Sequence, residues 1–153
     1  MKLLALKVYF FLATTCPITQ QYTAYINQFT QQAAAQHIEV TLVFPAKNNN
    51  KKEVEAFIHE YHLSASVLLD KRYALSKKLK ASVTPEVYLL NEKDQVLYHG
   101  AIDNWYYALG KNRLEISEHY LDDAVAQALN QQPIIRPFVK PVGCFIETGI
   151  PTN

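Results

Sequence analysis

The chain is poor in cysteine and has no long hydrophobic run. Its 153 residues include only two cysteines, Cys16 and Cys144, which lie near opposite ends. Two cysteines are too few for the disulfide framework of a small secreted domain, and their spacing matches no metal-binding motif. No apolar stretch approaches the roughly 18 residues that a membrane span requires. The sequence therefore excludes a disulfide-rich scaffold, and it predicts neither an integral membrane span nor a metal or other cofactor.

Concentrated charge is missing as well. The net charge is +1, and no cluster of Lys and Arg is accompanied by a ladder of aromatic residues. Nucleic acid is therefore not expected as the main partner, because phosphate binding needs concentrated positive charge. We interpret the one basic run, between Lys71 and Lys80, as the solvated face of a helix. His59 and His62 have a spacing that suits a metal, but no further ligands complete the set, so we interpret them as surface residues.

Residues 1–15 allow two interpretations. A lysine, a short apolar run and then Cys16 resemble a signal peptide followed by a lipid-attachment cysteine. However, residues 13–15 are a poor form of the Leu-Ala-Gly stretch that usually precedes such a cysteine, and cleavage would remove the only candidate for a first core strand. We therefore place this segment in the folded domain and keep a lipid-anchored envelope protein as the alternative.

Strand and helix patterns alternate along the chain. Short apolar runs rich in β-branched and aromatic residues predict strands, and a 3.6-residue period predicts helices. The order β-α-β-α-β-α-β-β-α predicts a mixed sheet with helices on both faces, and its last two strands form a hairpin. The predicted strands are Leu6–Leu12, Ile38–Phe44, Val67–Leu69, Val87–Leu90 and Val96–His99, and the predicted helices are Ile18–Gln36, Val54–Tyr61, Tyr73–Lys80 and Tyr120–Leu129.

The chain has the length and composition of one globular domain followed by a tail. Hydrophobic residues make up 49% of the sequence. Residues 131–153 contain four of the seven prolines, so we divide the chain into a domain, residues 1–130, and an extended tail, residues 131–153, that carries Cys144. The tail is expected to wrap the surface rather than to pack as an element, and residues 47–50 to form a polar loop.

Several segments carry a resemblance to a known family. A cysteine at a strand-to-helix junction and Thr84-Pro85 just before a strand resemble the thioredoxin fold. FLATTCPITQQY, LLDKRYALSKKLKASVTPEVYLLNEKDQVLYHGAIDNWY, ALGKNR and the terminal KPVGC together resemble redoxin domains of the AhpC/TSA-like, peroxiredoxin-related type. The resemblance covers nearly the whole chain. It implies a thioredoxin-like α/β fold, with a mixed central sheet flanked by helices and an extended C-terminal tail, and a cis Pro85 against the active-site thiol.

The resemblance also implies partners and a location. Protein thiols or disulfides, or a reductant protein, are the expected partners, and a haem-containing partner is a further candidate because some redoxin domains are joined to c-type haem modules. Relatives of this type are mostly exported, which favours the periplasm or another exported location, with the cytoplasm as the alternative.

Three departures from the known patterns leave the chemistry open. Thioredoxins carry a second cysteine where this chain has Thr19, and the Pro and Thr of the peroxiredoxin pattern are replaced by Tyr9 and Ala13. The second cysteine of the copper-chaperone relatives is replaced by Leu12. Disulfide exchange is therefore favoured over a peroxiredoxin-like thiol peroxidase, and a redox-inactive binding module is the alternative.

Cys16 is the candidate nucleophile. Unpaired backbone N–H groups and the helix dipole favour a thiolate at a helix start, and Pro17 suits the first helical position. A buried, inert thiol is the alternative. The hydroxyl of Thr19 is either a hydrogen-bond donor to the thiolate or part of an ordinary first turn. Cys144 allows three interpretations: a distal resolving cysteine that cycles with Cys16, a permanent structural disulfide with Cys16, or an unpaired thiol.

The remaining candidates surround the predicted thiol. With Pro17, the residues Thr84 and Pro85 are expected to contact substrate, since a cis Pro85 would present the Thr84 backbone to an extended chain. Trp105 belongs to an aromatic segment that lines a partner-binding face or packs into the core. Glu86 is a candidate proton acceptor, although we expect a solvent-facing carboxylate.

Overall fold

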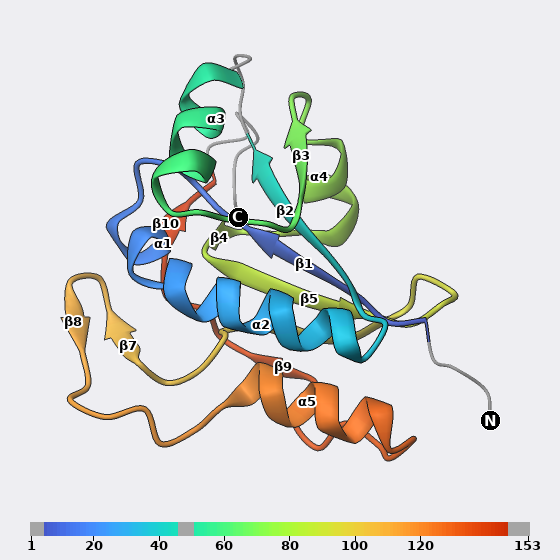
Figure 1. Cartoon of the computed structure of the whole chain (residues 1–153). Helices are drawn as coiled ribbons and strands as arrows, with labels where there is room; N and C mark the ends of the chain where they lie inside the picture. Colours follow the sequence, from blue (N-terminus) through green and yellow to red (C-terminus); the bar gives the residue numbers. More distant parts are fainter. Residues whose placement is uncertain (1–4, 46–50, 147–153) are drawn as a thin grey trace.

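The computed structural model describes residues 5–45 and 51–146 of the chain. A six-stranded mixed sheet, in the order β3-β2-β1-β5-β6-β9, forms its centre (Figure 1). The strands β1, β2 and β3 run parallel, whereas β5 is antiparallel to β1 and β6 is antiparallel to β5. The predicted sheet and hairpin are confirmed. The strand bounds are β1 Lys7–Phe11, β2 Glu39–Pro45, β3 Ser66–Asp70, β5 Glu86–Leu90, β6 Val96–Gly100 and β9 Phe138–Val139.

The strand β1 lies in the middle of this sheet. Phe10 is paired with Leu42 of β2 on one side and with Val87 of β5 on the other, and its side chain is completely buried. Cleavage before Cys16 would remove the whole strand. A lipid-anchored form that begins at Cys16 would therefore lack the central strand of this sheet. Residues 1–4 of the apolar opening and the predicted loop at 47–50 lie outside the described residues, as do residues 147–153 of the tail.

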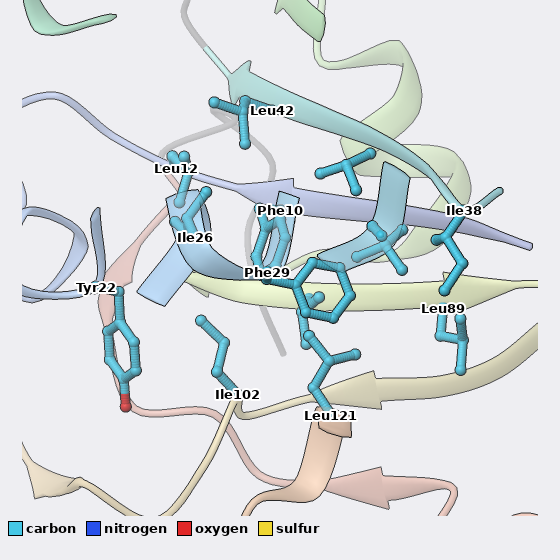
Figure 2. Close-up of a cluster of buried hydrophobic side chains, with 14 of the residues drawn as sticks. Phe10, Leu12, Tyr22, Ile26, Phe29, Ile38, Leu42, Leu89, Ile102 and Leu121 are labelled. Atoms are coloured by element: carbon cyan, nitrogen blue, oxygen red, sulfur yellow. The ribbon is translucent and has the colours of Figure 1, made fainter. Parts of the chain in front are cut away.

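Helices cover both faces of the sheet, as predicted. One large core lies between the sheet and the helices α2, α3 and α5. In this core Phe10 meets Phe29 edge to face (Figure 2), at a centroid distance of 5.5 Å. A smaller core, around Phe11 and Tyr88, packs against α4 on the opposite face. Burial of each such side chain stabilises the fold by about 1.5–3 kcal/mol. The helix bounds are α1 Pro17–Gln21, α2 Thr23–Ala35, α3 Lys51–Glu60, α4 Ala74–Leu79 and α5 Tyr120–Leu129.

The first predicted helix is divided into two. The expectation of one helix over Ile18–Gln36 is wrong, because Tyr22 separates the short α1 from α2. The hydroxyl of Thr23 donates to the carbonyl of Gln20 at 2.9 Å, and the Tyr22 amide bonds to Thr19, only three residues back. A side chain that takes over a backbone carbonyl in this way competes with the regular helical ladder. The break leaves Cys16 on a separate single turn.

The described part of the tail, residues 131–146, is extended, as predicted, but two of its segments form strands. The strand β9 pairs in parallel with β6, and the amide of Ala101 donates to the carbonyl of Val139 at 3.0 Å. Gly100 allows this approach because a Cβ there would collide with the Val139 carbonyl. The strand β10, Cys144–Phe145, pairs antiparallel with β4, Val83–Thr84. These pairings satisfy strand edges that would otherwise be open, and the sequence analysis did not predict them.

The segment between β6 and α5 contains two further short strands. Tyr106–Ala108 (β7) and Lys111–Asn112 (β8) form a small hairpin that the sequence analysis did not predict. In the described part of the chain, every helix lacks either the length or the apolar character that crossing a bilayer would require.

Candidate redox site

Cys16 lies where β1 gives way to a helix, as predicted. It is the N-cap residue of α1, its φ and ψ are −82° and 118°, and Pro17 follows at the first helical position. The carbonyl of Cys16 accepts the amide of Gln20 at 3.1 Å, which closes the first turn. The Cys16 residue is only 2% exposed, whereas Pro17 is exposed. The thiol position therefore combines a helix start with almost complete burial.

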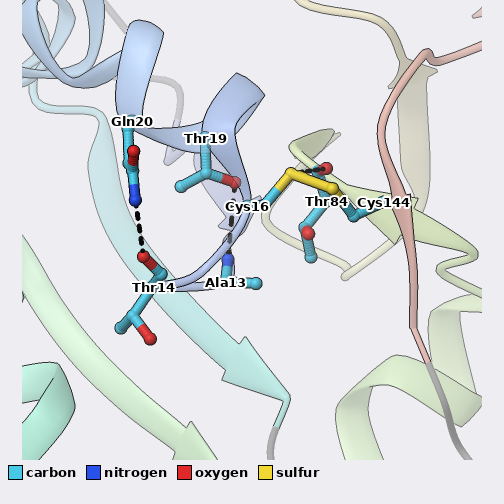
Figure 3. The surroundings of a disulfide bond; sticks show 7 residues. All are labelled: Ala13, Thr14, Cys16, Thr19, Gln20, Thr84 and Cys144. Atoms are coloured by element: carbon cyan, nitrogen blue, oxygen red, sulfur yellow. Dashed lines mark hydrogen bonds between the residues drawn. A yellow bond between two sulfur atoms is a disulfide. The ribbon is translucent and has the colours of Figure 1, made fainter. Parts of the chain in front are cut away.

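Cys16 forms a disulfide with Cys144 of the tail (Figure 3). The two Cα atoms are 6.1 Å apart although the residues are separated by 128 positions in the sequence. Cys144 is half-buried. The interpretation of Cys144 as an unpaired thiol is therefore wrong. A redox-cycling pair and a permanent structural bridge remain as the two interpretations.

Thr84, the residue before the cis proline, lies directly against this disulfide. The Thr84–Pro85 peptide bond is cis, as expected from the resemblance. The Sγ atom of Cys16 is 3.3 Å from the carbonyl oxygen of Thr84. A disulfide sulfur has no proton to donate, so this contact becomes a hydrogen bond only when Cys16 is reduced to a thiol. Thr84 is also the strand partner of Cys144, so one residue contacts both halves of the bridge.

Gly143 makes the close approach of the tail possible. A Cβ atom at this position would lie 2.7 Å from the carbonyl carbon of Thr84 and would overlap its oxygen. Real Cβ contacts are not that short, so any other residue would push the tail away from β4. The sequence analysis did not single out Gly143. The signal was present: the chain has only four glycines, and this one directly precedes Cys144.

Thr19 lies next to Cys16 but bonds elsewhere. Its fully buried side chain accepts the amide of Ala13 at 3.4 Å, and the amide group of Gln20 donates to the carbonyl of Thr14 at 3.0 Å (Figure 3). Both bonds hold the turn that presents Cys16. The role of Thr19 in catalysis is a prediction that this arrangement does not test.

Glu86 is buried rather than solvent-facing, which corrects the expectation from the sequence. Its residue is 2% exposed, and its carboxylate accepts the amide of Ser82 at 2.8 Å and the hydroxyl of Tyr88 at 3.2 Å. The amide of Val83 also points to this carboxylate, at 3.5 Å. His99 Nδ1 lies 3.6 Å from its second oxygen. A single buried carboxylate thus anchors the segment that leads into the cis proline.

Removal of this carboxylate should destabilise the protein. Glu86→Ala leaves the Ser82 and Val83 amides and the Tyr88 hydroxyl without their acceptor, and we expect it to lower the free energy of unfolding by about 3 kcal/mol. Urea unfolding monitored by circular dichroism measures this change. The exposed Glu115→Ala is the matched control and should change the free energy by less than about 0.5 kcal/mol. Equal effects of the two substitutions would contradict the anchoring role.

A second buried carboxylate, that of Asp103, connects Trp105 to Tyr22, the residue between α1 and α2. It accepts the hydroxyl of Tyr22 at 2.5 Å and the amide of Trp105 at 2.9 Å. Tyr22, Asp103, Pro85 and Val142 are among the residues that line a small cavity beside the cis proline. Trp105 is half-buried and packs against the Tyr22 ring at a centroid distance of 5.4 Å. The sequence analysis missed Asp103, because nothing in its local pattern distinguishes a buried carboxylate from a loop residue.

Burial of Asp103 predicts a pH dependence of stability. Desolvation raises the pKa of Asp103 above its ordinary value of 3.8, although the Tyr22 hydroxyl and the Trp105 amide oppose the shift. The folded state therefore binds this proton more tightly, and the stability gained from it is present below pH 3.8 and is lost as the pH rises through the raised pKa. Asp103→Asn keeps an acceptor oxygen but cannot titrate. We expect its free energy of unfolding, measured by urea titration, to fall less than that of the wild type as the pH rises from about 4 to about 7. Parallel profiles would contradict this assignment.

Two further groups of residues named in the sequence analysis lie on the surface of the protein. The cationic side chains between Lys71 and Lys80 are exposed, as expected for a solvated face, but of these residues only Lys77 and Lys78 lie within the helix α4. His59 and His62 are exposed, in agreement with their interpretation as surface residues. In the described ranges, no three His, Cys, Asp or Glu residues gather closely enough to hold a metal ion.

A mixed sheet, a cysteine at the start of the first helix and a cis proline beside it define a thioredoxin-fold domain. The chain belongs to the Redoxin family, whose model matches residues 5–104. This confirms the resemblance to redoxins of the AhpC/TSA-like type. The matched region includes Cys16, Thr19 and Pro85, whereas Cys144 lies outside it.

Solved structures show the same fold. A hypothetical protein from Sinorhizobium meliloti 1021 has a TM-score of 0.81 at 20% identity, over 93% of this chain and 79% of that one. An uncharacterized conserved protein from Geobacillus kaustophilus has a TM-score of 0.81 at 17% identity, over 97% of this chain and 79% of that one. A secreted disulfide oxidoreductase from Mycobacterium tuberculosis, homologous to DsbE of E. coli, has a TM-score of 0.53 at 13% identity, over 60% of this chain and 66% of that one. No curated protein matches the chain significantly.

Proposed function

We propose that this protein is a thiol-disulfide oxidoreductase in which Cys16 is the nucleophile and Cys144 is the distal resolving cysteine. The observation that carries the proposal is the place of the disulfide: it joins the helix-capping Cys16 to Cys144, which is paired with Thr84 next to the cis proline. A redoxin without a local second cysteine needs another sulfur to complete its cycle. Cys144 supplies that sulfur within bonding distance.

The proposed reaction transfers two electrons to a partner disulfide. The Cys16 thiolate attacks one partner sulfur, forms a mixed disulfide and releases the other partner sulfur as a thiolate. The Cys144 thiolate then attacks Cys16 Sγ, closes the Cys16–Cys144 bond and releases the second partner thiolate. The two protons given up by the cysteines go through solvent to the released thiolates. The chain is oxidised from dithiol to disulfide, and the partner is reduced from disulfide to dithiol.

A donor thiol restores the dithiol form, and the difference in burial indicates where it attacks. Cys16 is almost completely buried, whereas Cys144 is half-buried. A donor thiolate therefore attacks Cys144 Sγ more readily and expels Cys16 as the leaving thiolate. The backbone N–H groups at the helix start favour that anion. A second donor thiol then frees Cys144, and the donor is oxidised to a disulfide.

The other candidate residues take supporting roles in this proposal. Thr19 positions Cys16, because its hydroxyl accepts the Ala13 amide and so holds the turn before the helix. The Thr84 carbonyl accepts the S–H group of reduced Cys16. Pro17, Pro85 and Trp105 are proposed to contact the partner around the sulfur. Protein thiols and disulfides are the proposed partners, and no contact in the described part of the chain favours a haem-containing partner over these.

We propose an exported location for the protein. Disulfides persist in oxidising compartments and are rare in the cytosol of mesophiles. The secreted mycobacterial oxidoreductase of the same fold also supports this location. The lipid-anchored alternative is disfavoured further, because a lipidated Cys16 would carry a thioether and could not bond to Cys144.

A redox titration of the full chain tests the proposal. The oxidised protein is equilibrated in dithiothreitol buffers of defined potential, and the fraction of free thiols is measured by mass after alkylation. We expect a two-electron transition with a midpoint above about −300 mV, because structural disulfides have potentials below that value. A midpoint well below it would identify the bridge as a permanent structural one. Alkylation of both thiols without any catalysed exchange would favour a redox-inactive binding module.

A further inference from the structure

The end of the tail occupies one side of the strand that precedes the cis proline. Within the described residues, β10 is the only strand paired with β4. Cys144 is opposite Thr84, Phe145 is opposite Val83, and the Ile146 amide donates to the Ser82 carbonyl at 2.9 Å. Figure 3 shows the tail passing beside Thr84 with its cysteine bonded to Cys16. The tail thus lies as an extended peptide whose sulfur forms a disulfide with the proposed nucleophile.

We propose that residues 143–146 occupy the binding site of the partner, so that the tail and an extended cysteine-containing peptide compete for the same edge of β4. This inference rests on the proposed function of Cys16. It goes beyond the expected contact of a partner with the Thr84 backbone by adding a rule for the residue before the partner's cysteine. It also makes the tail a competitor whose attachment depends on the redox state of the protein.

The geometry of the tail indicates what the partner must look like. The partner's backbone must be extended, because the edge of β4 presents backbone N–H and C=O groups that form hydrogen bonds with another strand. The residue before its cysteine must be glycine, since even the Cβ atom of alanine would collide with Thr84 at the place of Gly143. The residue after the cysteine is less restricted, because Phe145 at that place is 79% exposed. The partner is therefore an extended peptide with a Gly-Cys sequence.

The redox state of the Cys16–Cys144 bridge decides whether the tail or an outside peptide pairs with the edge of β4. In the disulfide form the tail is covalently tethered, so its effective concentration at β4 is high and an outside peptide cannot displace it. In the dithiol form β9 still pairs with β6, but within the described residues the end of the tail, residues 143–146, is retained by short backbone pairing and by the packing of half-buried Val142 next to it. Val83 and Thr84 are 6% and 2% exposed while β10 is in place, so departure of the tail uncovers a strand edge that needs a new partner.

When the tail returns to β4, attack of Cys144 on the mixed disulfide is coupled to release of the reduced partner. The incoming partner is held by two connections, its bond to Cys16 and its pairing with β4. When Cys144 attacks Cys16 Sγ, the bond from Cys16 to the partner sulfur breaks and the partner sulfur leaves as a thiolate. In the same movement Cys144 takes its place opposite Thr84, and the partner strand is displaced. Chemistry and displacement therefore occur together.

The test uses the full chain carrying Cys144→Ser, which leaves Cys16 free to form a stable mixed disulfide. Oxidised glutathione first converts Cys16 of this protein to its glutathione mixed disulfide and releases one reduced glutathione. Two synthetic peptides with blocked ends, PVGCFI and PVACFI, then displace the bound glutathione by thiol-disulfide exchange, and the mixed disulfides are quantified by intact mass. We expect PVGCFI to be favoured by about tenfold or more, because the extra methyl group overpacks the contact with Thr84. Equal formation of the two mixed disulfides would overturn the inference and leave the proposed function intact. Failure to react with either peptide or with glutathione would overturn the proposed function as well.

Hydrogen exchange measured by mass spectrometry provides the second readout. In the oxidised wild type, both residues 82–84 and residues 143–146 should be protected. In the Cys144→Ser protein bound to PVGCFI, we expect residues 82–84 to stay protected while residues 143–146 exchange freely. Continued protection of residues 143–146 in that complex would show that the peptide and the tail do not share an edge, and would overturn the inference.

Discussion

Replacement of Cys16 by serine is expected to abolish catalysed disulfide exchange. A serine hydroxyl at the start of α1 cannot attack a disulfide sulfur, so turnover should fall to the uncatalysed rate. The rate is measured with a fluorescent disulfide-linked peptide and dithiothreitol as the donor. Ile135→Ala is a suitable control, because this tail residue is 79% exposed and lies outside β9 and β10. Turnover of Cys16→Ser at the wild-type rate would remove the proposed function.

The companion variant Cys144→Ser separates the roles of the two sulfurs. It keeps the nucleophile but lacks the resolving thiol, so we expect one equivalent of mixed disulfide on Cys16 and little turnover. Intact mass spectrometry after quenching with acid detects this adduct. A Cys144→Ser protein that turns over as fast as the wild type would show that the tail cysteine is not the resolving residue, even if Cys16 proves essential.

Reduction of the Cys16–Cys144 bridge is expected to cause a large loss of stability. The bridge closes a loop of 128 residues, for which the chain-entropy model gives about 5 kcal/mol at 25 °C. For a domain of this size, that loss corresponds to a fall in the melting temperature of about 10–20 °C. Differential scanning calorimetry of the oxidised protein, with and without a reductant, measures the difference.

A cysteine variant provides the control for the stability measurement. Cys144→Ser cannot form the bridge, so its melting temperature should match that of the reduced wild type and should not respond to the reductant. An oxidised protein that melts at the same temperature as the reduced one would contradict the closed loop. A large difference in stability is compatible with a redox role, because the donor and the partner of an oxidoreductase set the direction of electron flow.

Local pattern predicted most of the fold. The apolar run around Phe10 and the helical spacing around Leu121 each depend on residues within one element, so both elements were placed within one or two residues of their observed bounds. The break at Tyr22 was missed, because it results from a Thr23 side-chain bond that a periodicity analysis does not detect. The tail strands were missed for a related reason: each is only two residues long, too short to show a period.

The sequence alone determined where the candidate nucleophile lies in this protein, because a Cys-Pro pair between a buried strand and a helix is a local feature. Only the tertiary structure decided what surrounds that thiol. It brought Cys144 to Cys16, buried Glu86 beneath the cis-proline segment and made Gly143 the residue that permits the approach. These contacts join parts of the chain that are far apart in sequence. Their presence depends on how the whole sheet and tail pack together, and no window of neighbouring residues contains that information.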